Sequence, residues 1–313
     1  MCLERGGALP HPKKDTTHLK INEMKQIRQV YLLLAAAALV MAGCSGAPNA
    51  GTQDKQSLRD SAKVKAATYE GSMIYYSLPS PLEVAFIVEN SGVGYEPKIL
   101  HKTELGVRYS TTKSQAINLG VYGSDLSYSI LFNQQQVALK YLDCIKELSS
   151  GLDVSDTTSV KKLREMEDNI HDKEKLKRIV AQTFFHSDAL LKENSRRPTA
   201  IMIVAGMWVE SIYIATTLSN GDPDHNPSLT RCIVEQGLVF DDLLGMLESV
   251  PNNDDIAYIK QKINVIGDDY NKIKAALGGS FVFTSEHINL DAETFKRICA
   301  DVKAVRTDFT ELF

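Results

Sequence analysis

The sequence is poor in the features that mark several large classes of protein. It contains a single tryptophan and no tetratricopeptide pattern of Trp, Leu, Gly and Tyr. Basic residues are not in excess, because 35 Lys and Arg stand against 39 Asp and Glu, a formal net charge of −4. We therefore expect no regular repeat and no nucleic-acid-binding surface.

Familiar catalytic and metal-binding motifs are missing as well. The sequence has no G-x-S-x-G, no H-E-x-x-H and no glycine-rich phosphate loop. The stretch "DPDHNPSLTRCI" begins like a calcium loop at Asp222. However, it places Pro227 where glycine is required and Ile233 where the bidentate glutamate belongs. We expect a helix connection there and no metal or cofactor, and we favour a non-enzymatic protein.

One uninterrupted apolar run lies near the N-terminus. The stretch "MKQIRQVYLLLAAAALVMAGC" begins at Met24, carries Lys25 and Arg28, and is apolar over residues 30–43. Basic residues, a run of this length and small residues before the cysteine are typical of a secretory signal. This run is shorter than the about 20 residues that a membrane-spanning helix needs. We interpret residues 1–43 as a signal segment whose true start is Met24.

The end of this run resembles a bacterial lipobox. Met41, Ala42, Gly43 and Cys44 match its pattern, with methionine at a position where leucine is commoner. In that family the cysteine sulfur receives a diacylglycerol, and cleavage falls just before it. The resemblance implies that Cys44 is the lipid attachment site and that the anchor provides the membrane contact. The alternative is an ordinary signal peptide or a buried helix with a chance cysteine.

The residues after this cysteine predict a tether. Residues 44–65 lack aromatic side chains and periodicity, so we expect a flexible link between the lipid and a single all-α domain over 66–313. In lipoproteins an aspartate directly after the cysteine favours inner-membrane retention, whereas Ser45 follows here. The resemblance therefore implies the periplasmic face of the outer membrane.

From about residue 80 the chain predicts one helix after another in an antiparallel bundle of about eight to nine helices. Ser80, Asn226, Asn253 and Asp291 are expected to start helices, and glycines such as Gly92 to end them. Apart from the helix opened by Pro81, the expected ranges are 112–132, 133–149, 158–170, 172–194, 198–219, 227–249, 253–277 and 292–312. Only the stretch over residues 280–290 could form a short strand.

Two of these helices have regular apolar seams that predict packing against other helices. The first seam comprises Ile256, Ile259, Ile263, Ile266, Tyr270, Ile273 and Leu277. The second comprises Phe295, Ile298, Val302, Val305, Phe309 and Leu312.

The stretch "IMIVAGMWVESIYIATTL", residues 201–218, is apolar on every side and carries Glu210 as its only charge. We favour the central helix of the bundle over a second membrane span, because Glu210 and the hydroxyl residues disfavour lipid. A buried carboxylate must be paired, hydrogen-bonded or protonated. Glu210, with Tyr213 on the same face, is thus either a ligand contact or a satisfied core carboxylate.

The helix expected over 112–132 has two contrasting faces. Ala116, Gly120, Gly123 and Ser127 share one face, which would let another helix approach closely. The other face carries the polar residues Asn118, Tyr122, Asp125 and Ser129. These could border a ligand cleft, although such a stripe is more often solvated.

Three cysteines follow Cys44, and three cannot all pair with one another. Cys144, Cys232 and Cys299 each lie within a helical pattern. We expect these three cysteines to pack in the core as small hydrophobic residues. The alternative is one disulfide between two of them, which an oxidising compartment would permit.

The region from "YYSLPSPLEVAFIVENSG" through "NLGVYGSDLSYSILFNQ" is similar to a group of uncharacterised helical lipoproteins of Gram-negative bacteria, a resemblance that carries no activity. We therefore expect a lipid-anchored periplasmic protein that acts through interaction with an unknown protein partner or in a structural role. The alternatives are a small-molecule-binding protein with a pocket near Glu210 and Asp125, and an enzyme of unrecognised type.

Overall fold

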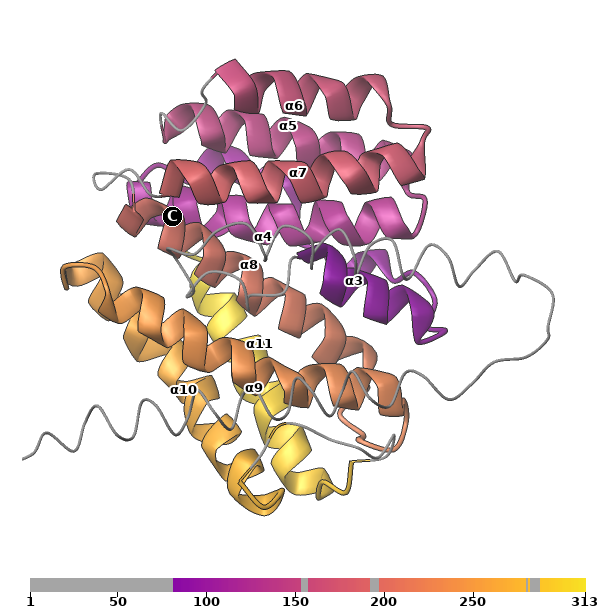
Figure 1. Cartoon of the computed structure of the whole chain (residues 1–313), viewed down its shortest axis with the longest axis vertical. Helices are drawn as coiled ribbons and strands as arrows, with labels where there is room; N and C mark the ends of the chain where they lie inside the picture. Colours follow the sequence, from indigo (N-terminus) through magenta and orange to yellow (C-terminus); the bar gives the residue numbers. More distant parts are fainter. Residues whose placement is uncertain (1–80, 153–156, 192–196, 280, 282–287) are drawn as a thin grey trace, which may run out of the picture. The chain divides into compact units, whose positions relative to one another are not determined.

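The described part of the chain is built from α-helices (Figure 1). The computed structural model describes residues 81–152, 157–191, 197–279, 281 and 288–313, which all belong to the compact unit Glu70–Phe313. No strand occurs among these residues, so the prediction of an all-α helical bundle is confirmed. The helices are α3 (Pro81–Asn90), α4 (Thr112–Leu131), α5 (Gln135–Gly151), α6 (Thr157–Asp168), α7 (Lys173–Leu191), α8 (Arg197–Leu218), α9 (Pro227–Glu248), α10 (Asp254–Ala276) and α11 (Ala292–Thr310).

Several sequence predictions fall outside these described residues. They are the signal segment 1–43, the lipid site Cys44, the tether 44–65 and the N-cap Ser80. Most of the stretch 280–290 is outside as well, and its described residues, 281 and 288–290, form no strand.

Helix starts follow the capping residues that the sequence predicts. The side chain of Asn226 accepts a hydrogen bond from the backbone N–H of Leu229 at 3.2 Å. Asn253 starts α10 and Asp291 starts α11 in the same way, at 2.9 and 2.8 Å. Each bond satisfies a backbone donor that has no partner inside its own helix.

Two helices end at glycines with positive backbone angles, as the sequence predicts for Gly92. Gly92 has φ 82° after α3 and Gly278 has φ 77° after α10. Only glycine adopts this region at no steric cost, and the chain turns away from the helix axis there.

Helix α8 is the central element of the fold, as its apolar composition predicts. In Figure 1 it crosses the middle of the bundle, with α4 to α7 on one side and α9 to α11 on the other. It is the one described helix long and apolar enough to cross a membrane, but 72% of its most apolar window is buried inside the protein. Such burial is typical of a core helix, which other helices rather than lipid surround.

The backbones of α4 and α8 touch at two glycines. A Cβ atom added to Gly206 would lie 2.0 Å from the carbonyl oxygen of Ile117, and one added to Gly120 would lie 2.0 Å from that of Ile203. Neither distance leaves room for a methyl group. The contact confirms that the small-residue face of α4 receives another helix. Later along the same helices, Ser124 donates to the carbonyl of Met207 at 2.9 Å, so α4 and α8 advance in the same direction.

Both predicted seams are buried, as expected. Every member of the α10 and α11 seams is at most 2% exposed, except Leu277 and Leu312, which are partly buried. The cysteines Cys144, Cys232 and Cys299 are free, and the first two are buried. No disulfide therefore joins these three residues.

A segment that the sequence analysis did not single out connects α3 to α4. We call residues 95–109 the strap. It contains two short 3-10 helices, η1 (Pro97–Ile99) and η2 (Thr103–Arg108). The side chains of Leu100 and Tyr109 are buried in the core. The strap covers the polar face of α4, which matters for the candidate site.

We predict that Gly206→Ala destabilises the fold, because the added methyl forces the α4 and α8 backbones apart. The free energy of unfolding should fall by about 1–3 kcal/mol or more. Gly245 in α9 is the control, since a Cβ there meets no atom within 4 Å. Gly245→Ala should raise stability by up to about 1 kcal/mol, the intrinsic helix preference of alanine over glycine. Chemical denaturation measures both, and equal effects would contradict the tight crossing.

Candidate functional site

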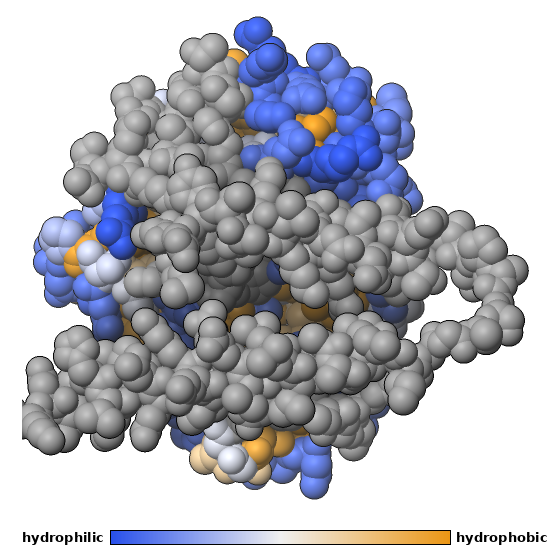
Figure 2. Space-filling model, viewed as in Figure 1, coloured by the Kyte–Doolittle hydropathy of each residue, from blue (hydrophilic) through white to orange (hydrophobic). Residues whose placement is uncertain are grey.

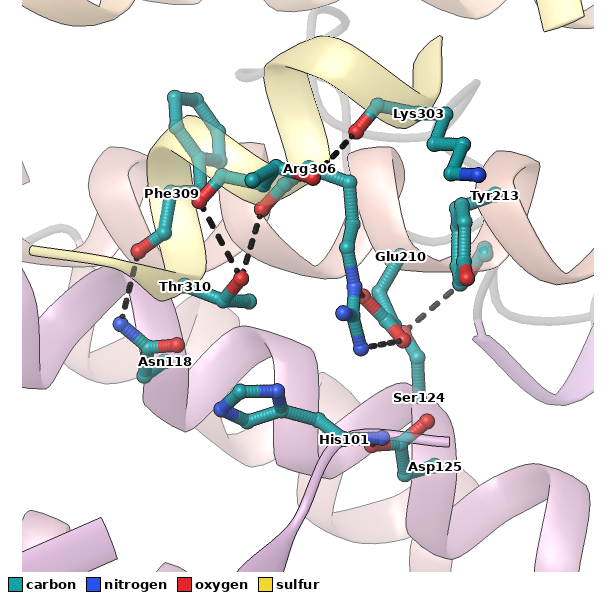
Figure 3. Close-up of polar contacts among 12 residues, drawn as sticks. His101, Asn118, Ser124, Asp125, Glu210, Tyr213, Lys303, Arg306, Phe309 and Thr310 are labelled. Carbon is teal, nitrogen blue, oxygen red and sulfur yellow. Dashed lines mark hydrogen bonds and ion pairs between the residues drawn. The ribbon is translucent and has the colours of Figure 1, made fainter. Parts of the chain in front are cut away.

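The centre of the candidate site is a buried ion pair between α8 and α11 (Figure 3). Glu210 is 0% exposed and accepts two hydrogen bonds from Arg306, from Nε at 2.9 Å and from Nη2 at 3.1 Å. Such a two-pronged pair is stronger and better oriented than a single contact. The arrangement agrees with the interpretation of Glu210 as a satisfied core carboxylate.

Tyr213 lies one turn after Glu210 on α8 and packs against the same arginine. The guanidinium carbon of Arg306 is 4.7 Å from the centre of the Tyr213 ring, within the range of a cation–π contact. Tyr213 is partly buried, and the Arg306 side chain is 14% exposed. The ion pair therefore approaches solvent only on the arginine side.

Asp125 of α4 is the second carboxyl group in this cluster. It is 0% exposed, and its Oδ2 accepts a hydrogen bond from the backbone N–H of His101 at 3.0 Å. Burial, followed by the negative charge of Glu210, raises the pKa of Asp125 well above its ordinary value, although Arg306 and the His101 N–H oppose the shift. The shift favours the protonated form of Asp125, and its other oxygen, Oδ1, is buried without a hydrogen-bond partner among the described residues.

His101 in the strap also belongs to the cluster and is uncharged. Its Nε2 lies 2.6 Å from the hydroxyl of Tyr109, which itself donates to the carbonyl of Thr310 at 2.9 Å. The histidine must therefore donate at Nε2. Burial lowers the pKa of His101 to about 3, and the charges of Arg306 and Lys102 act in the same direction.

The remaining predicted residues of α4 are buried too, so the interpretation of their face as a solvated stripe is wrong. Asn118, Tyr122 and Ser129 are each 0% exposed. Asn118 donates to the carbonyl of Phe309 at 3.0 Å, and Tyr122 donates to that of Lys102 at 2.9 Å. The end of α11 and the strap lie over this face, which periodicity within one helix cannot reveal.

The cluster brings together all five candidates from the sequence, namely Asn118, Tyr122, Asp125, Glu210 and Tyr213. It leaves little room beside them. The neighbouring hollow, lined by Val84, Ala85, Ser124, Ser211 and Ile214, is too narrow for a water molecule. No group of three His, Cys, Asp or Glu residues in the described ranges could hold a metal. The cluster joins α4, α8, α11 and the strap through hydrogen bonds and one ion pair.

Arg306, His101 and Tyr109 are the members that sequence reasoning missed. A signal for Arg306 was present, because it lies one residue after Val305 and three before Phe309 at the border of the α11 seam. An arginine in that place can reach a carboxylate on the helix that the seam covers. His101 and Tyr109 carried no periodic signal, since they lie in an irregular connection.

The two unusual protonation states have opposite effects on how stability depends on pH. The unfolded chain protonates His101 below about pH 6.5, whereas the native state does not until about pH 3, so acid destabilises the fold. Conversely, the native state keeps the proton of Asp125 above pH 3.8, where the unfolded chain loses it, so alkali destabilises the fold. The two effects oppose each other at every pH above 3.8 at which Asp125 keeps its proton in the native state and His101 is protonated only in the unfolded chain.

We predict that Asp125→Asn stabilises the protein increasingly as pH rises. The amide reproduces the shape of the protonated acid and its hydrogen bonds, but it has no proton to lose. The difference from wild type should grow by about 1.4 kcal/mol per pH unit above about pH 4, up to the native pKa of Asp125. Urea titrations from pH 4 to 9 measure it. Asp143→Asn, at a side chain 74% exposed, is the control and should give a constant difference. A constant difference for Asp125→Asn would show that the carboxyl is ionised.

We predict that Arg306→Met is strongly destabilising, because it leaves Glu210 buried without its cation. The loss should be about 3–5 kcal/mol. Arg231→Met removes the arginine of a partly exposed pair with Glu235 on α9 and should cost about 0.5 kcal/mol or less. Thermal or chemical unfolding compares the two variants at one pH. Similar losses would mean that Glu210 does not depend on Arg306.

No protein-family model, curated protein or solved structure matches this chain. The interpretation of the site rests on the geometry of its own residues. These form a closed ion pair, a protonated carboxyl and a neutral histidine, all enclosed by helices and the strap.

Proposed function

We propose that the protein is a lipid-anchored envelope protein whose helical domain acts by binding another protein or in a structural role. The observation that carries this proposal is Cys44 at the end of "ALVMAGC", directly after a basic segment and an apolar run. The basic residues, the length of the run, the small residues and the cysteine are independent features that agree.

The ionisable groups in the interior of the domain support a binding or structural role rather than a catalytic one. The Glu210 carboxylate is occupied by Arg306, and Asp125 and His101 are held in their uncharged forms. Groups arranged in this way stabilise the fold, and a small molecule could reach Glu210 and Asp125 only after the strap or α11 had moved. The alternative of a pocket near these two residues therefore requires a conformational change.

The described surface is consistent with a domain that stays in water beside a membrane. In Figure 2 the described atoms that grey atoms do not cover are mostly hydrophilic. The exposed large apolar residues belong to different elements, with Val107 in η2, Leu238 in α9 and Val265 in α10. Scattered residues of this kind do not form a lipid-binding face. The anchor would thus provide the attachment, and Ser45 after the cysteine favours the periplasmic face of the outer membrane.

We predict that Cys44→Ser prevents lipid attachment. The chain expressed in a Gram-negative host with labelled palmitate should lose its label, and it should leave the membrane fraction or accumulate as an unprocessed precursor. Cys299→Ser is the control, because Cys299 is a partly buried helix residue and should keep both label and location. Unchanged labelling of Cys44→Ser would refute the lipoprotein proposal.

A further inference from the structure

The turn between α8 and α9 contains the one Asn-Gly pair of the sequence, Asn220 followed by Gly221. Both residues have positive φ angles, 56° and 66°. The backbone N–H of Asp222 donates to the carbonyl of Ser219 at 3.2 Å, which closes the turn. Asparagine and glycine are the residues that most readily adopt this left-handed backbone.

The side chain of Asn220 lies at the surface beside a histidine. Asn220 and His225 are both exposed, and Nδ2 of the asparagine is 3.1 Å from Nε2 of the histidine. Imidazole accepts and returns protons readily. A side-chain amide can leave only as its nitrogen gains a proton, and His225 lies where it can supply that proton as a general acid.

The backbone nitrogen of Gly221 is available as a nucleophile. Its N–H makes no hydrogen bond among the described residues. The two neighbouring N–H groups, by contrast, are bonded, that of Asn220 to the carbonyl of Thr217 at 3.3 Å and that of Asp222 within the turn. Glycine also has no side chain that would shield its nitrogen. For attack this nitrogen has to rotate toward the Asn220 side chain, against the single turn bond to Ser219.

We propose that Asn220 is a site of spontaneous deamidation, assisted by His225. The Gly221 nitrogen gives its proton to solvent hydroxide and attacks Cγ of Asn220. The bond from Cγ to the amide nitrogen breaks, and a proton from His225 lets that nitrogen depart as ammonia. Water then opens the five-membered imide at either carbonyl and leaves aspartate or isoaspartate. One water is consumed and one ammonia is released, with no change of oxidation state.

Both products alter the connection between α8 and α9. Either one places a carboxylate just after the last turn of α8, where the helix dipole disfavours negative charge. The new charge also lies close along the chain to Asp222 and Asp224. Isoaspartate adds one carbon to the backbone between residues 220 and 221, which changes the length of a turn closed by a single hydrogen bond. The modification therefore weakens the turn that joins two packed helices.

Asn90 at the end of α3 provides a comparison inside the same chain. Its side chain is exposed too, but the N–H of the next residue, Ser91, donates to the carbonyl of Ile87 at 2.9 Å. Ser91→Gly creates a second exposed Asn-Gly pair, whose attacking nitrogen is held by α3. The two pairs then have the same sequence and differ in whether that nitrogen is bonded.

The experiment incubates the purified, folded full chain of Ser91→Gly in mildly alkaline buffer. Peptide mapping by mass spectrometry follows the gain of about 1 Da at each asparagine. Isoaspartate is measured by methyl transfer from labelled S-adenosylmethionine with an isoaspartate methyltransferase. We expect Asn220 to react at least about tenfold faster than Asn90, because Asn90 reacts only after the end of α3 opens.

A second variant tests the histidine. Adding His225→Gln keeps a hydrogen-bonding side chain but removes the proton donor, so the reaction at Asn220 should slow at least about tenfold while that at Asn90 stays unchanged. Wild type carries the same Asn220 turn and should react at the same rate there as Ser91→Gly.

A folded chain whose Asn220 stays intact, while the chain unfolded in urea is modified there, would overturn the proposal, because the turn would then protect the pair. Equal rates at Asn220 and Asn90 would overturn it as well, as would an unchanged rate in His225→Gln. The measurement needs neither a membrane nor a partner protein. Its outcome is therefore separate from the lipid-anchor proposal, which the labelling of Cys44 decides.

Discussion

The contact between the backbones of α4 and α8 is the constraint on which the rest of the structure depends. Because Gly120 and Gly206 let the two helices touch, the side chains that follow on each helix must share one small space. Asp125 and Glu210 are therefore neighbours in the interior, where two negative charges cannot coexist without large cost. Arg306 neutralises one carboxylate and a retained proton neutralises the other.

The cluster is electrically balanced as a result. Glu210 and Arg306 cancel, while Asp125 and His101 carry no charge in the native state. A buried pair of this kind contributes less to net stability than its short distances suggest, because both ions lose their hydration. The pair restricts how α11 lies on α8, since Nε and Nη2 of Arg306 both bond Glu210.

The helices and their ends were predictable because the signals lie within each segment. Asn253 and Asp291 cap the helices that follow them, and the apolar seams face the core. Apolarity on every side identified α8 as central. The polar face of α4 was misread as solvated, because the residues that cover it come from the strap and from α11. Periodicity describes the faces of one helix, whereas the identity of its neighbour is set by tertiary contacts that no local pattern encodes.

The distance along the chain between the partners in this cluster determines the order in which the domain can be completed. A hydrogen bond joins Tyr109 to Thr310, 201 residues apart in the sequence. Glu210 pairs with Arg306, which lies 96 residues after it. Closing such long loops is slow, and the contacts that reward it form last. A nascent chain that has not yet released α11 therefore holds an unpaired carboxylate where its core should form. The ion pair can form only after α11 has been synthesised, because Arg306 lies 96 residues after Glu210.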